Sequence, residues 1–92
     1  SESEFQELVR EAYGLVRAKI NIDKRDNLRV RDLPSRATHG LGNTLRLCDS
    51  ENGEQGQTIY LYKKNVERIS WDRDDIVDHI FQSLMEEISL GF

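Results

Sequence analysis

The sequence has little of what several protein classes require. It contains one cysteine, Cys48, so an internal disulfide is excluded, whereas short secreted domains usually carry several. No apolar run approaches the ~20 residues that span a bilayer. The chain opens on an acidic helical pattern, so we expect no signal peptide. These features favour an intracellular protein, cytoplasmic or nuclear, with no membrane role.

Motifs of known chemistry are also scarce. The two histidines, His39 and His79, form no metal-ligand spacing with each other or with Cys48. No two residues are recognisable from the sequence as a catalytic base and its orienting partner. We therefore expect no catalytic residues, no metal and no cofactor. A small enzyme stays open only if folding gathers these three residues around a pocket.

The length of 92 residues fits one domain, and we expect residues 1–92 to form it. Hydrophobic residues make up 37% of the chain, slightly below the globular average. A domain of this size buries roughly 60–65% of its unfolded surface. Its stability is therefore modest, and a partner or self-association is an expected source of additional stability.

The net charge of −4 conceals a division of charge along the chain. Residues 19–46 contain seven basic side chains against three acidic ones, whereas residues 72–92 contain six acidic side chains and one basic one, Arg73. Separated charge of this kind indicates which partners a protein attracts rather than how it folds. The middle of the chain and its C-terminal segment are therefore the candidate binding regions.

Two amphipathic helices are predicted at the ends of the chain. Apolar residues recur at spacings of three and four over residues 3–20, at Phe5, Leu8, Val9, Ala12, Val16 and Ile20. A second stripe follows Asp72, at Ile76, Val77, Ile80, Phe81, Leu84 and Ile88, and Gly91 ends it. Asp72 is the expected N-cap, with Asp75 at the third helical position. Trp71 is expected to pack on Ile76 as a hydrophobic staple.

Three strands are predicted between the helices, at residues 28–33, 44–48 and 58–62. Asn52-Gly53 is typical of a tight hairpin between the last two strands. A tight turn there places Leu45 and Leu47 on the face opposite the apolar residues of the third strand. We expect these leucines to point inward, which requires a bulge or a longer loop at Gly56. The order α-β-β-β-α predicts an α+β fold, a small antiparallel sheet with both helices packed on one face.

The uncovered face of this sheet is the first candidate site. If the apolar strand residues point toward the helices, five residues point away: Arg29, Arg31, Arg46, Tyr60 and Tyr62. Arginines there can contact phosphates, and tyrosines can stack on unpaired bases. The same face can bind an acidic protein surface, or be an ordinary exposed sheet face, where arginine and tyrosine are common.

The polar side of the second helix is the second candidate site. Five acidic residues lie off its apolar stripe: Asp74, Asp75, Asp78, Glu86 and Glu87. None of them is followed four residues later by a lysine or arginine, although such pairs usually steady exposed helices. The face can dock on a basic partner, or be an ordinary solvated helix face.

Segregated charge on a small domain without recognisable chemistry favours a non-catalytic protein-binding module, such as a regulator, an inhibitor or an interaction domain of a larger protein. The alternative is a nucleic-acid-binding module that uses the basic and aromatic sheet face, which the negative net charge disfavours. Self-association is open as well, with the basic sheet face of one copy against the acidic helix of another.

Overall fold

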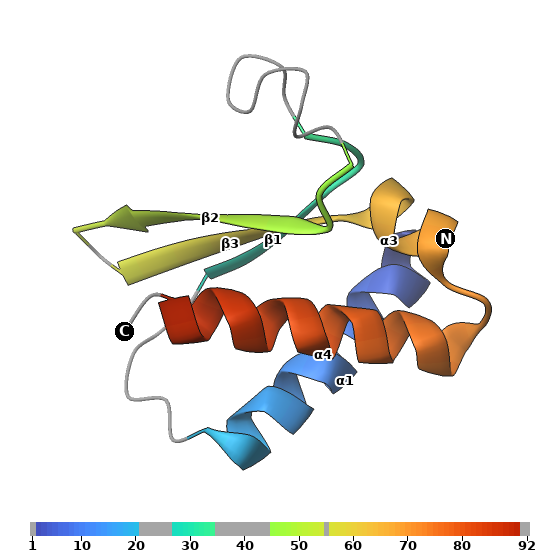
Figure 1. The fold of residues 1–92 in the computed structure, drawn as a ribbon, viewed down its shortest axis with the longest axis horizontal. Helices are drawn as coiled ribbons and strands as arrows, with labels where there is room; N and C mark the ends of the chain where they lie inside the picture. Colours follow the sequence, from blue (N-terminus) through green and yellow to red (C-terminus); the bar gives the residue numbers. More distant parts are fainter. Residues whose placement is uncertain (1, 21–26, 35–44, 55, 91–92) are drawn as a thin grey trace.

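The computed structural model describes residues 2–20, 27–34, 45–54 and 56–90 (Figure 1). Over these residues the elements are α1 (Glu2–Lys19), β1 (Asn27–Arg31), β2 (Cys48–Gly53), β3 (Gly56–Tyr62), α3 (Lys63–Ile69) and α4 (Arg73–Leu90). The α+β class and the two long terminal helices are confirmed. The structure also contains the short helix α3, which the sequence analysis did not predict.

β3 is the central strand of the sheet, whose order is β1-β3-β2. β1 runs parallel to β3 and β2 runs antiparallel to it, so the sheet is mixed and the predicted antiparallel sheet is wrong. Consecutive strands β1 and β2 lie at opposite edges of the sheet, and β1 ends and β2 begins beside the same end of β3, at Tyr62 and Leu61. A tight hairpin cannot make this connection, which explains the long segment between the two strands.

The β2–β3 hairpin turns later in the chain than Asn52-Gly53. Its ladder pairs Cys48 with Leu61 and continues without a break to Gly53 and Gly56. The hairpin between the second and third strands is confirmed, whereas the bulge or longer loop expected at Gly56 is wrong. Gly56 has a φ of 115°, which glycine adopts without steric strain.

The register brings small and polar residues of β2 toward the helices. Cys48 and Ser50 each donate a hydrogen bond to α4. Leu45, expected to point inward, precedes β2 and is 68% exposed. Leu47 is only partly buried. The predicted strand at residues 44–48 thus ends where the observed strand begins.

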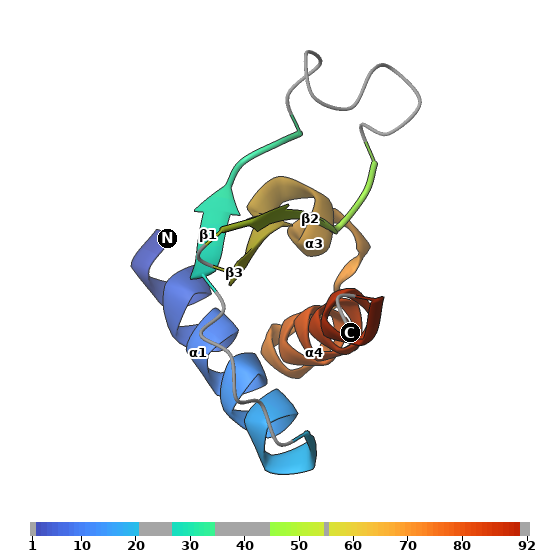
Figure 2. The ribbon, with the colours of Figure 1, turned by 90° about the vertical axis from the view of Figure 1, so that its left-hand side faces the viewer.

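α1 and α4 lie against the same face of the sheet, as expected (Figure 2). Buried side chains from both helices and the sheet form one hydrophobic cluster, whose largest members are Phe5, Ile59, Leu61, Ile80 and Leu84. The apolar stripes of the two helices supply most of it. Within the described ranges, no helix has the length and apolar character needed to cross a membrane.

α3 follows β3 directly and lies at the end of the sheet where β3 ends (Figure 1). Asn65 of α3 is buried, and its Nδ2 donates to the Arg46 carbonyl oxygen at 2.8 Å. The Lys64 N–H donates to the Asp32 carbonyl oxygen at 3.2 Å. These bonds tie α3 to the residue that follows β1 and to the segment just before β2.

The N-terminus of α4 is capped as predicted, but without the staple. Asp72 Oδ1 accepts the Asp75 N–H at 2.9 Å, and Asp75 Oδ2 accepts the Trp71 N–H at 2.9 Å. These bonds satisfy backbone donors that a helix start leaves without partners. Trp71 is 94% exposed, so its ring does not pack on Ile76 and the predicted staple is wrong.

Ile59→Ala should destabilise the domain far more than Leu45→Ala. Ile59 is fully buried on the central strand, and truncating such a side chain costs about 2–5 kcal/mol. Truncating the exposed Leu45 should change the free energy of unfolding by about 0.5 kcal/mol or less. Urea unfolding measures both values, and a comparable loss in Leu45→Ala would contradict the observed strand register.

Candidate functional site

The acidic residues of α4 divide between two sides of the helix. Asp74, Asp78 and Glu86 are exposed, and we call these three the acidic face of α4. Asp75 is partly buried and serves the N-terminal cap. Glu87 is 6% exposed, so its expected place on the exposed acidic face is wrong.

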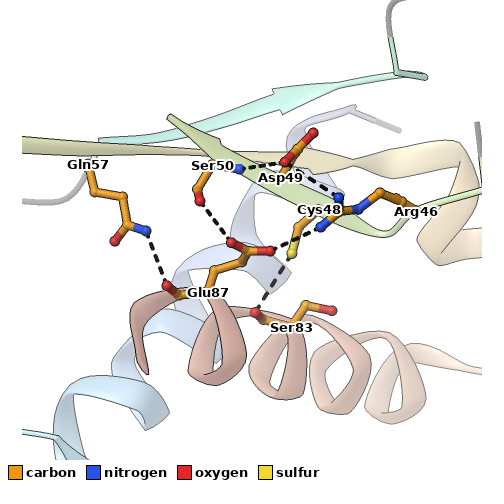
Figure 3. A network of polar contacts seen from close by, with 7 residues as sticks. All are labelled: Arg46, Cys48, Asp49, Ser50, Gln57, Ser83 and Glu87. Atoms are coloured by element: carbon orange, nitrogen blue, oxygen red, sulfur yellow. Dashed lines mark hydrogen bonds and ion pairs between the residues drawn. The ribbon is translucent and has the colours of Figure 1, made fainter. Parts of the chain in front are cut away.

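Glu87 instead joins α4 to the sheet through a network of polar contacts (Figure 3). Its carboxylate accepts a hydrogen bond from Ser50 Oγ at 2.8 Å and lies 3.5 Å from the guanidinium of Arg46. Gln57 Nε2 donates to the Glu87 carbonyl oxygen at 3.1 Å. Because a buried carboxylate is costly without such partners, these contacts hold the last turns of α4 against β2 and β3.

A groove lies beside the acidic face, between the second half of α1 and the first half of α4. Its volume is about 770 Å³, and its apolar lining consists of Leu15, Ala18, Val77 and Phe81. Asp74 and Asp78 add two carboxylates to the lining, and Lys19 adds one ammonium group. Leu15 is 49% exposed and Phe81 is partly exposed, so apolar surface is left in contact with water. Since Asp74 and Asp78 of the acidic face line the groove, the groove and these two residues form one continuous area, the α1–α4 surface.

The open face of the sheet carries both signs of charge. Arg29 and Arg31 are exposed on β1, and the Arg31 guanidinium lies 5.0 Å from the centre of the Tyr60 ring, a cation–π distance. Tyr60 Oη donates to a Glu51 carboxylate oxygen at 3.4 Å. Asp49 and Glu51 thus lie on this face, level with Tyr60 and Thr58. The sequence did not place them there because the predicted second strand ended before both residues.

Arg46 and Tyr62 differ from the other three expected sheet-face residues. Arg46 lies 3.5 Å from a carboxylate oxygen of Glu87 and 3.9 Å from one of Asp49. Tyr62 is 2% exposed. Burial first, and then the charge of Asp49, raises the pKa of the Tyr62 hydroxyl to about 12. The other three expected residues do lie together, around Tyr60.

Cys48 is buried against α4, where its thiol donates to the Ser83 carbonyl oxygen at 3.7 Å. Burial first, and then the Glu87 carboxylate, raises the pKa of the Cys48 thiol from 9.0 to about 12. A nucleophilic cysteine needs a lowered pKa and a neighbouring base. Cys48 is therefore placed as a core residue rather than as a nucleophile.

His79 lies near Ser70 and Asp75 at the junction of α3 and α4. Its Nδ1 lies 2.9 Å from Ser70 Oγ and 3.9 Å from Asp75 Oδ2. In a catalytic Ser-His-Asp arrangement the serine and the carboxylate contact opposite ring nitrogens, whereas here both face the same one. This cluster therefore joins two helices and lacks the geometry of a triad. His39 lies outside the described residues, and among those described no group of three histidine, cysteine or acidic side chains is placed to hold a metal ion.

Comparisons with protein-family models, with curated proteins and with solved structures found no match. A function for this chain therefore has to be argued from its own surfaces. The α1–α4 surface and the mixed-charge face of the sheet are the two candidates.

Replacing Glu87 should destabilise the domain, and replacing its neighbour Glu86 should not. Glu87→Ala leaves the Ser50 hydroxyl without its acceptor and removes one of the two carboxylates beside Arg46, at a cost of about 1–3 kcal/mol. Glu86→Ala removes an exposed carboxylate, and we expect a change of about 0.5 kcal/mol or less. Urea unfolding of the two variants measures the difference. Equal stabilities would show that Glu87 does not anchor α4.

Raising the pH should weaken the fold through Cys48 and Tyr62. Both groups have a pKa of about 12 in the folded protein, above their ordinary values of 9.0 and 10.0. Below 9.0, the ordinary pKa of a cysteine thiol, the folded and the unfolded protein both hold the two protons. Above it the unfolded chain releases them first, so the free energy of unfolding falls as the pH rises toward 12.

Urea unfolding at about pH 8 and about pH 10.5 measures this fall. The matched control is the double variant Cys48→Ala with Tyr62→Phe, which lacks both titrating groups and should show a smaller fall. An equally steep fall in the double variant would assign the pH dependence to other groups.

Proposed function

We propose that this chain is a non-catalytic protein-binding module that binds through the α1–α4 surface. It would act as a regulator, an inhibitor or an interaction domain of a larger protein. The observation that carries the proposal is the groove of about 770 Å³ whose exposed apolar lining adjoins the carboxylates of Asp74 and Asp78. Apolar surface surrounded by polar groups is typical of protein interaction sites.

The two components of this surface contribute differently to binding. Removing apolar surface from water contributes about 25 cal/mol per Å², whereas an exposed ion pair contributes about 1 kcal/mol or less. The lining around Leu15 and Phe81 therefore supplies most of the affinity. Asp74 and Asp78 select a basic partner and speed its approach.

Trp71 adds a further exposed apolar group at the N-terminal end of α4. Its ring is 94% exposed, while its backbone is fixed by the hydrogen bond to Asp75. Tryptophan is enriched among the residues that dominate binding energy at interfaces. Its place just before the helix that carries the acidic face supports a protein partner on this side of the domain.

The sheet face supports the nucleic-acid alternative less well. Arg29, Arg31 and Tyr60 are in place there, but Asp49 and Glu51 share the face and repel phosphate. Tyr62 is buried and unsuited to stacking on a base. We therefore rank another protein first and nucleic acid second as the partner, and propose no cofactor and no membrane role.

Two further features complete the proposal. The single, buried cysteine suits a reducing intracellular compartment, cytoplasmic or nuclear. The described elements share one hydrophobic cluster, which supports residues 1–92 as a single domain. Self-association through the basic strand β1 and the acidic face of α4 stays an alternative, which sedimentation of the purified protein tests directly.

Charge reversal on α4 should abolish capture of a partner protein, and charge reversal on β1 should not. The purified domain is used as bait in a nuclease-treated cell lysate, beside the variants Asp74→Lys with Asp78→Lys and Arg29→Glu with Arg31→Glu. Each variant changes two exposed charges, and circular dichroism verifies that each is folded. We expect a protein retained by the wild type and by the β1 variant, and lost from the α4 variant.

Two outcomes would reject this function. One is retention of the same protein by the α4 variant. The other is that the wild type recovers only nucleic acid, from lysate without nuclease treatment, and that the β1 variant does not. This result would move the sheet-face alternative into first place.

A further inference from the structure

The groove between α1 and α4 combines an apolar lining with charges of opposite sign on its two sides. Leu15 and Ala18 line it from α1, and Val77 and Phe81 line it from α4. Among the described residues of the lining, the carboxylates of Asp74 and Asp78 belong to α4, while the one cation, that of Lys19, belongs to α1. An occupant that matches this lining has an apolar face and carries its positive charge on the side that lies along α4.

The groove is a surface feature rather than an enclosed cavity. Leu15, which lines it, is 49% exposed, and the lining comes from two neighbouring helices. Apolar grooves between helices commonly receive an amphipathic helix, which inserts residues of its apolar face at intervals of three and four positions. A small molecule would cover only part of such an open groove and would leave the rest in contact with water.

The spacing of the carboxylates also fits a helix. Asp74 and Asp78 are exposed at positions i and i+4 of α4, so they lie on one side of the helix, about 6 Å apart along its axis. A partner helix beside α4 that carries lysine or arginine four residues apart presents cations at the same spacing. In the free protein Asp74 and Asp78 repel each other weakly, and such cations relieve that repulsion.

Resting on the function proposed above, we propose that the occupant is a basic amphipathic helix of a partner protein. Its apolar residues enter the groove between Leu15 and Phe81, and its lysine or arginine side chains pair with Asp74 and Asp78. A second copy of this chain fits less well, because its α1 is not a basic helix: the exposed residues Glu4, Glu7 and Glu11 offset Arg10, Arg17 and Lys19. Nucleic acid is repelled by the same carboxylates.

The probe is a synthetic peptide of about 18 residues, long enough to form a helix in isolation. It is fluorescein-labelled and made of leucine and lysine in an amphipathic helical pattern. A matched peptide carries glutamate in place of every lysine. Fluorescence anisotropy with the purified domain should give at least about tenfold tighter binding for the leucine–lysine peptide, with an affinity that weakens as salt increases.

Variants locate the binding site. Asp74→Lys with Asp78→Lys should weaken binding of the leucine–lysine peptide by at least about tenfold. The matched control is Glu7→Lys with Glu54→Lys, which makes the same change in net charge at two exposed positions outside the groove, and it should weaken binding by less than about threefold. If the charge-reversed α4 variant is unstable, Asp74→Asn with Asp78→Asn serves in its place.

The apolar contact is tested with a second matched pair. Leu15→Gln should weaken binding of the leucine–lysine peptide by about tenfold. Leu45 is also exposed but lies outside the groove, so Leu45→Gln should leave binding unchanged. Equal binding of the two peptides, no binding of either, or equal effects of the groove and control variants would overturn the proposal. A lysate partner whose capture still requires Asp74 and Asp78 would then leave the protein-binding function intact and reject only the helical occupant.

Discussion

The rotation of α4 about its own axis determines most of what this domain presents to its surroundings. Glu87 is buried beneath the sheet, with its carboxylate bound to Ser50 and Arg46. Side chains on a helix are fixed relative to one another, so holding Glu87 inward turns Asp78 and Glu86 toward solvent. The same rotation leaves Phe81 half-buried at the edge of α1. The polar network at one end of the helix and the groove at the other are therefore consequences of one packing arrangement.

The position of β3 between β1 and β2 has a comparable effect on the open face of the sheet. β1 and β2 are both neighbours of β3 and not of each other. The basic residues of β1 and the acidic residues of β2 therefore lie on either side of Tyr60. Tyr60 contacts both, through Arg31 on one side and Glu51 on the other. A face with charges of both signs balances itself internally, which weakens its attraction for phosphate.

The sequence predicted the parts of this structure that local periodicity controls. Both long helices and the capping by Asp72 were predictable because apolar spacing and cap residues report directly on helices. The position of Glu87 was also predictable, since it follows Ile80 by seven residues and Leu84 by three and so shares their buried face. We placed it off the apolar stripe with the other acidic residues, although it lies at the edge of that stripe, and the partners that allow its burial come from the sheet.

The remaining features depend on contacts between distant segments. β2 consists of Cys-Asp-Ser-Glu-Asn-Gly, residues that mostly disfavour strands, and it forms because β3 and α4 hold it. α3 is short and has no side-chain N-cap. The groove exists only where α1 and α4 meet, which no pattern within one segment reveals.

The most direct test of the α1–α4 surface is a nuclear magnetic resonance titration of the ¹⁵N-labelled domain with the leucine–lysine peptide. Binding at this surface predicts that the largest chemical-shift changes fall on the amides of Leu15, Val77, Asp78 and Phe81, while those of Arg29, Arg31 and Tyr60 stay in place. Changes centred on the β1 and β3 amides, with the groove unaffected, would contradict the account and place binding on the sheet.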